Sequence, residues 1–140
     1  MRKWLACLVV VLIAPLTQAE QKQTFTHFDA HYVVFPTTFL EPDIANRYNI
    51  VRAGDRALLN VSILSHEGSA IRGKITGSTK NLLGQIYAMK FHEVVEEEAV
   101  YYLAEFKHTD HDLLTFTIEI AVEGSTKETV SFQQKMFVKR

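Results

Sequence analysis

The sequence predicts an all-β protein, an antiparallel two-sheet β-sandwich of the immunoglobulin-like type with about seven strands and one short helix. From Thr24 onward, apolar residues recur at every second position, which is the period of half-buried strands. Turn-forming residues interrupt this alternation at the short spacing typical of antiparallel connections. The same alternation also fits a small barrel, so the sandwich is the favoured architecture and the barrel is its alternative.

The clearest strand covers residues 114–122, where Leu114, Phe116 and Ile118 share an apolar face and mostly polar residues lie between them. The predicted strands are residues 31–35, 57–64, 71–78, 85–95, 99–107, 114–122 and 128–138. Gly73 and Gly77 lie on one face of the third of these strands. Because glycine weakens the interior of a strand, we expect a bulge or a close crossing of backbones there.

One helix is expected between the first two strands, over residues 42–48. Pro42 suits a first helical position, because its missing N–H has no helical partner there and its fixed φ matches the helix. Asp43 is favourable beside the positive end of the helix dipole. Asn49 tolerates the left-handed conformation and should end the helix.

Residues 1–19 read as an export signal. Arg2 and Lys3 precede an apolar run that Pro15 breaks, and Thr17-Gln18-Ala19 places small residues where a signal peptidase would cleave. The apolar run is only about eleven residues, too short to span a bilayer, which takes about 20. We therefore expect cleavage after Ala19, which would leave residues 20–140 as a single β-sandwich domain.

Composition excludes several functions for the exported part. The chain has 15 Lys and Arg against 16 Asp and Glu, a net charge of −1, and the charges are interspersed, so nucleic acid is not an expected partner. No segment after the leader is apolar enough to span a membrane. The single cysteine, Cys7, lies in the leader, so the exported part has neither a disulfide nor a thiolate nucleophile.

Short motifs follow one another along almost the whole exported part. They are His31-Tyr32-Val33-Val34-Phe35, Phe39-Leu40, Tyr48-Asn49-Ile50-Val51-Arg52, Asn60-Val61-Ser62, Asn81-Leu82-Leu83-Gly84 and Tyr101-Tyr102-Leu103-Ala104. In these motifs the chain resembles the domain-of-unknown-function family 4426, small exported proteins of gram-negative bacteria. The resemblance implies a periplasmic β-sandwich without an established activity, and it supplies no catalytic residues.

The segment of residues 39–52 is the first candidate binding site. Arg47, Tyr48 and Arg52 are residue types favoured at binding surfaces, and this connection is longer than a hairpin. The alternative, which we favour, is a lid in which Phe39, Leu40, Ile44 and Tyr48 cover one end of the core while the arginines face water. The spacing of these four residues lets one helical turn bring them to one side.

The second candidate is a metal site in the segment from His108 to Asp112. Two imidazoles and two carboxylates, from His108, Asp110, His111 and Asp112, could bind Cu(II) or Zn(II). A structural zinc site takes four ligands, and only His66 or His92 could add a further imidazole. The favoured interpretation is a solvated polar turn, because a hairpin loop calls for the same residue types.

No motif of nucleophilic catalysis is present: Gly-x-Ser-x-Gly does not occur, and no local pattern ties a histidine and an acid to a serine. We therefore expect a non-catalytic binding or accessory protein of the cell envelope that uses no cofactor and whose partner is a periplasmic or envelope protein. An exposed sheet edge or the loop of residues 39–52 would serve that role. The alternatives are a metal-binding protein and, last, an enzyme whose site is assembled in space.

Overall fold

The computed structural model describes residues 20–138, and the leader therefore lies outside the described residues. Within residues 20–138 the chain forms nine strands, one 3₁₀ turn and one short α-helix. In order these are β1 (Gln21–Thr24), β2 (Asp29–Pro36), η1 (Thr37–Phe39), α1 (Pro42–Arg47), β3 (Arg56–Leu64), β4 (Lys74–Lys80), β5 (Ile86–Met89), β6 (Phe91–Glu96), β7 (Ala99–Lys107), β8 (Asp112–Ala121) and β9 (Glu128–Met136).

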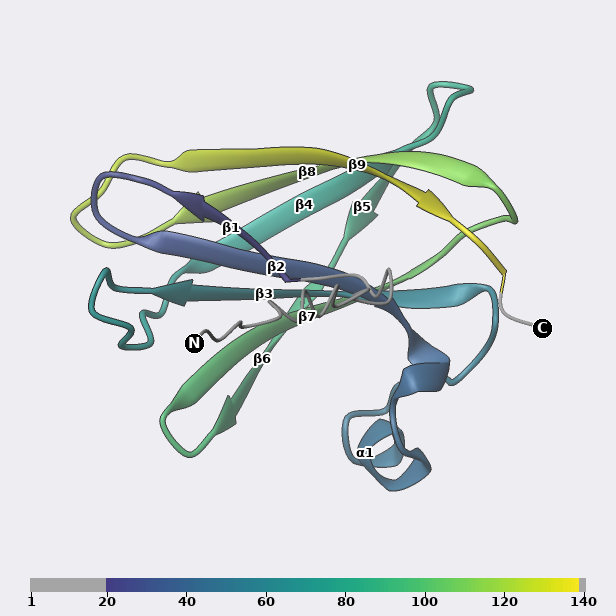
Figure 1. Cartoon of the computed structure of the whole chain (residues 1–140), viewed down its shortest axis with the longest axis horizontal. Helices are drawn as coiled ribbons and strands as arrows, with labels where there is room; N and C mark the ends of the chain where they lie inside the picture. The colour runs from purple at the N-terminus through teal and green to yellow at the C-terminus, as the bar shows by residue number, and fades with distance from the viewer. Residues whose placement is uncertain (1–19, 139–140) are drawn as a thin grey trace, which may run out of the picture.

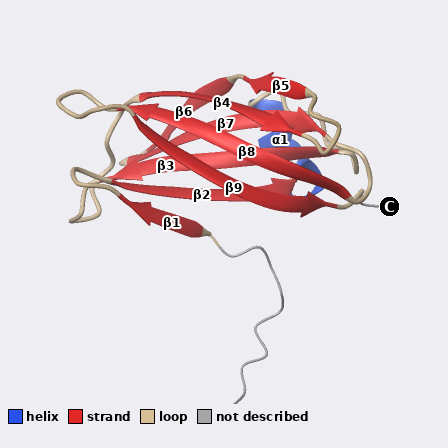
Figure 2. Ribbon diagram, turned by 90° about the horizontal axis from the view of Figure 1, so that it is seen from above, coloured by secondary structure: helices blue, strands red, loops and turns tan. Residues whose placement is uncertain are grey.

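The strands form two antiparallel sheets that face each other, as Figures 1 and 2 show. The five-stranded sheet has the order β1-β2-β3-β7-β6, and the four-stranded sheet has the order β5-β4-β8-β9. The prediction of an all-β two-sheet sandwich with one short helix is confirmed. In the described part of the chain no helix is long and apolar enough to cross a membrane.

The strand count differs from the sequence-based expectation in two places. β1 has the sequence Gln-Lys-Gln-Thr and lies at a sheet edge, where both of its faces meet water and no apolar alternation is needed. The expected strand over residues 85–95 is two strands: the chain leaves the four-stranded sheet after Met89, passes Lys90 and enters the five-stranded sheet at Phe91. Periodicity records alternation along a strand but not a change of sheet.

Gly77 lies where this crossing comes close to β4. A Cβ atom at Gly77 would lie 2.9 Å from the Thr117 carbonyl oxygen and 3.1 Å from Cε2 of Phe91. Gly73, just before β4, is equally crowded, with a Cβ position 2.8 Å from the Ala121 carbonyl oxygen. The close backbone approach expected at these two glycines is therefore present.

Apolar side chains from the inner faces of both sheets form one core. A row of aromatic rings crosses it from Tyr32 on β2 through Phe132 and Phe116 to Phe106 on β7, with centroid separations of 4.7, 4.7 and 5.3 Å. Elsewhere in the core, the Tyr102 hydroxyl on β7 accepts a hydrogen bond from the Gly73 amide, 3.0 Å away, and donates to Glu93. That bond ties the five-stranded sheet to the chain leading into β4.

Candidate functional site

The connection from β2 to β3, residues 37–55, is here called the crossover segment, and it contains the predicted helix. Pro42 occupies the first turn of α1, Asp43 follows it, and Arg47 lies in the last turn, where a cation favours the dipole. Asn49 takes φ 57°, and the Ile50 amide then donates to the Ala45 carbonyl at 2.8 Å. The predicted helix and its left-handed end are confirmed.

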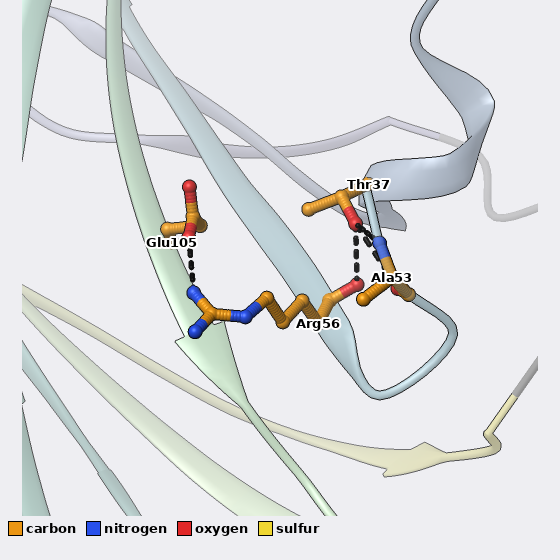
Figure 3. Close-up of polar contacts among 4 residues, drawn as sticks. All are labelled: Thr37, Ala53, Arg56 and Glu105. Atoms are coloured by element: carbon orange, nitrogen blue, oxygen red, sulfur yellow. Dashed lines mark hydrogen bonds and ion pairs between the residues drawn. The ribbon is translucent and has the colours of Figure 1, made fainter. Parts of the chain in front are cut away.

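Thr37 closes the crossover segment at its base (Figure 3). Its side chain is fully buried, and its Oγ1 accepts a hydrogen bond from the Ala53 amide at 2.9 Å. The same hydroxyl lies within donating distance of the Ala53 and Arg56 carbonyl oxygens, at 3.1 and 3.2 Å. One hydroxyl thus joins the two ends of the segment, so the loop between them is held at a fixed span.

The crossover segment packs as a lid, but on the outer face of the five-stranded sheet rather than over an end of the core. Leu40, Ile44 and Tyr48 line a hollow of about 150 Å³ whose floor includes Leu58. Leu58 is 1% exposed and its neighbour Leu59 0%, so β3 buries both faces and needs a cover on the outer one. Phe39 does not join this lid, since 62% of it is exposed.

The predicted binding residues of this segment have contacts within the protein. The Tyr48 hydroxyl donates to Oε1 of Glu96 at 2.5 Å, and this bond to a carboxylate raises the pKa of Tyr48. Arg52 donates from Nη2 to the Thr38 carbonyl oxygen at 3.2 Å. Arg47 is exposed beside Tyr48. Two of the three side chains therefore help to hold the lid closed.

A larger hollow of about 730 Å³ lies at one end of the sandwich, and we call it the hairpin cleft because the β4–β5 hairpin overhangs it. Glu105, one of the lining residues, accepts a hydrogen bond at Oε2 from Nη1 of Arg56 at 2.7 Å (Figure 3). The lining residues are Asp55, Thr79, Asn81, Leu82, Leu83, Gln85, Tyr87, Ala88, Met89, Glu105, Phe106, Lys107, His108, Thr109 and Asp112. The cleft combines aliphatic and aromatic side chains with a histidine and three carboxylates.

His108 lines the hairpin cleft and is not part of a solvated turn, since only 7% of it is exposed. The centroid of its ring lies 6.3 Å from that of Phe106, with the two rings tilted relative to each other. Its Nδ1 donates to the Thr109 carbonyl oxygen at 3.0 Å. Its backbone amide donates to the Asp55 carbonyl oxygen at 3.0 Å. The sequence carried the signal, because His108 continues the inward alternation of Tyr102, Ala104 and Phe106 along β7.

The other three residues of the predicted metal segment have partners other than His108. His111 has φ 60°, and its Nδ1 lies 3.4 Å from Oδ2 of Asp110. Its ring meets that of Phe137 edge-on, with the centroids 5.1 Å apart. Asp112 accepts a hydrogen bond from the Thr109 amide at 3.4 Å. Across residues 20–138, no three His, Cys, Asp or Glu side chains come together in a way that could hold a metal ion, and this includes His66 and His92.

Comparison with known proteins places the chain in a family. The model of the domain of unknown function DUF4426 matches residues 22–139. A crystal structure of a DUF4426 family protein from Pseudomonas aeruginosa PAO1 is similar, with a TM-score of 0.79, 34% sequence identity, and coverage of 86% of this chain and 97% of that one. No curated protein matches the sequence.

Two structures of FetP from uropathogenic Escherichia coli strain F11 share the fold. FetP expressed in the periplasm aligns with a TM-score of 0.64 and 16% identity, over 89% of this chain and 99% of FetP. A copper-bound FetP variant aligns with a TM-score of 0.65 and 17% identity, over 87% and 97%. At this identity the likeness extends to the sandwich alone, whereas the family model and the Pseudomonas structure show that this chain belongs to the DUF4426 family.

Proposed function

We propose that this chain is an exported, non-catalytic binding protein of the cell envelope, and that the hairpin cleft is its binding site. The observation that carries the proposal is the cleft itself, about 730 Å³, where an apolar surface from Leu82, Leu83, Met89 and Phe106 lies beside polar and charged side chains. Ligand sites in proteins are concave and mostly apolar, with a small number of placed polar groups that fix orientation. Export is supported by the leader-like residues 1–19 and by the periplasmic production of FetP, which shares the fold.

The chemistry of the cleft favours a ligand with an apolar body and a polar end. Leu83, Met89 and Phe106 offer apolar surface, and Tyr87 and His108 offer groups that can donate or accept hydrogen bonds. The Nδ1 of His108 already donates to the Thr109 carbonyl, which holds the ring in place.

Site-specific photo-crosslinking in the envelope tests the proposal. A photoreactive amino acid replaces Tyr87 in the cleft, Arg52 on the crossover segment or Thr129 on the outer face of β9, three exposed positions far apart in the sequence. We expect an adduct from position 87 and none from position 129. An adduct from position 52 alone would move the binding site to the Arg47, Tyr48 and Arg52 surface, and no adduct from either position would reject binding at both.

Metal binding is the second candidate, and the copper-bound FetP structure is the observation that favours it. His108 and His111 supply imidazoles near the cleft, although the described residues do not gather three ligands around one point. Titration with Cu(II) and Zn(II) decides between the candidates. Binding tighter than about micromolar that is lost in His108→Ala, His111→Ala but kept in a His66→Ala control would establish the metal site.

A further inference from the structure

The tip of the β4–β5 hairpin carries an unusual concentration of exposed apolar side chains. Leu82 is 77% exposed, Leu83 85%, Ile86 65% and Tyr87 58%. Single exposed apolar residues are normal on a soluble protein, but clusters of them mark surfaces that meet another apolar phase. In Figure 1 the turn between β4 and β5 stands out from the body of the sandwich at the upper right, so residues 81–85 form a projection.

Several polar groups of the hairpin turn bond to one another. Oδ1 of Asn81 accepts from the amides of Leu83 and Gln85, both at 3.0 Å, while its Nδ2 donates to Oε1 of Gln85 at 2.8 Å. The Gly84 amide donates to the Asn81 carbonyl at 3.0 Å, and the Asn81 amide donates to the Gln85 carbonyl at 3.1 Å. An amide that enters an apolar phase without a partner is costly, and these amides already have partners.

Two lysines flank the leucines. Lys80 and the leucines line one hollow, and Lys107 and the leucines line the hairpin cleft on the other side. Both lysines are exposed, and neither forms an ion pair within residues 20–138. Of the three carboxylates in the cleft, Glu105 is paired with Arg56, whereas Asp55 and Asp112 form no ion pair with either lysine. Apolar tips beside free cations are typical of segments that dock on anionic lipid.

We propose that the β4–β5 hairpin docks the protein on the surface of an anionic phospholipid bilayer. Leu82, Leu83 and Ile86 enter the acyl region, Tyr87 lies at the headgroup level where aromatic rings with a polar end collect, and Lys80 and Lys107 face lipid phosphates. A protruding tip of four side chains offers less area than the roughly 800 Å² per partner of a stable protein interface. A fluid bilayer can surround such a projection without presenting a complementary surface.

Vesicle binding of the protein purified from the periplasm tests this docking, after its mass has shown that no apolar leader remains. Vesicles of phosphatidylethanolamine with phosphatidylglycerol should carry the protein in flotation, and vesicles of phosphatidylcholine should carry less. Leu82→Ser, Leu83→Ser should weaken partition at least tenfold. Val51→Ser, a matched change at another exposed apolar residue, should leave it unchanged. Lys80→Gln, Lys107→Gln should weaken it by about fivefold per lysine at low salt.

A spectroscopic readout locates the contact. The only tryptophan of the chain is Trp4 in the leader, so Leu83→Trp and Val51→Trp each give the exported protein one fluorophore. On anionic vesicles the emission of Leu83→Trp should shift to the blue, and that of Val51→Trp should not. Absence of vesicle binding by the wild type, or partition unaffected by the leucine double substitution, would overturn the proposal. So would leucine-dependent dimerisation without vesicle binding, which would assign the hairpin to a second copy of this chain.

Discussion

Replacing Thr37 by valine should loosen the base of the crossover segment while keeping the shape of the side chain. The threonine is fully buried, and its hydroxyl accepts a hydrogen bond from the Ala53 amide. The same hydroxyl can donate to the Ala53 or the Arg56 carbonyl oxygen. Valine fills nearly the same volume, so no cavity forms, but the Ala53 N–H loses its acceptor. The variant therefore isolates the polar contribution of one hydroxyl.

The expected cost follows from two changes. An amide left without a partner in a buried setting costs about 1–3 kcal/mol, and the loss of one neutral donated hydrogen bond costs about 0.5–1.5 kcal/mol. The greater apolarity of valine offsets part of this, so the free energy of unfolding should fall by about 2–3 kcal/mol. For a domain of this size that corresponds to a decrease in Tm of about 8–12 °C.

Thr38 provides a matched control, because the same substitution one residue later meets the opposite situation. Its Oγ1 is buried and has no hydrogen-bond partner, while its carbonyl accepts from Arg52 and would be unaffected. Thr38→Val should therefore be neutral or slightly stabilising. Urea unfolding followed by circular dichroism measures both variants, and hydrogen exchange of the Ala53 amide should accelerate in Thr37→Val alone. A Thr37→Val variant that is no less stable than Thr38→Val would refute the reasoning.

Three further outcomes are expected. Tyr102→Phe should lower the free energy of unfolding by about 1–2 kcal/mol in urea unfolding, because the Gly73 amide loses its acceptor on the other sheet; an unchanged midpoint would contradict this bridge. Gly77→Ala should cost about 1–3 kcal/mol, since the new Cβ meets the Thr117 carbonyl oxygen at 2.9 Å, and a neutral result in the same assay would show that the crossing relaxes freely. The hydrogen bond to the Thr26 carbonyl, together with the nearby Asp29 carboxylate, raises the pKa of His66. Protonated His66 therefore stabilises the fold fully below about pH 6.5, and this stabilisation is lost as pH rises through the raised pKa. His66→Gln should flatten the fall in stability as pH rises above about 6.5, and an unaltered slope would count against the assignment.

The fold was largely predictable because most of its strands bury one face. The alternation of Leu114, Phe116 and Ile118 needs no tertiary information, since one oily face per strand specifies a sheet that packs on one side. The short helix followed from Pro42 and Asn49, whose backbone preferences are local. β1 was not predicted, because an edge strand built from polar residues shows no alternation of apolar and polar positions.

The candidate site was harder to predict, because it depends on which elements meet. His108 was expected in water, but it follows Phe106 on the inward side of β7 and lines a cleft that β5 helps to form. Residues 81–84 lie between the predicted strands 71–78 and 85–95, and the two leucines among them were the informative feature. Consecutive Leu58 and Leu59 likewise signalled a strand covered on both sides. For the leucines the signal was an apolar residue at a position where the local pattern calls for a polar one, and for His108 it was the inward alternation of β7.

The passage of the chain through Lys90 also decides where another polypeptide could attach. β5 and β6 are edge strands of the two sheets on the same side of the sandwich. Lys90 alone joins them, so the two sheets are covalently linked along that side. A foreign strand approaching there would meet two short margins that veer apart at the bend, with little straight backbone to pair with. Strand addition, swapping or fibril growth is therefore confined to the opposite flank, at β1 and β9, where Lys22 in the four-residue β1 discourages it.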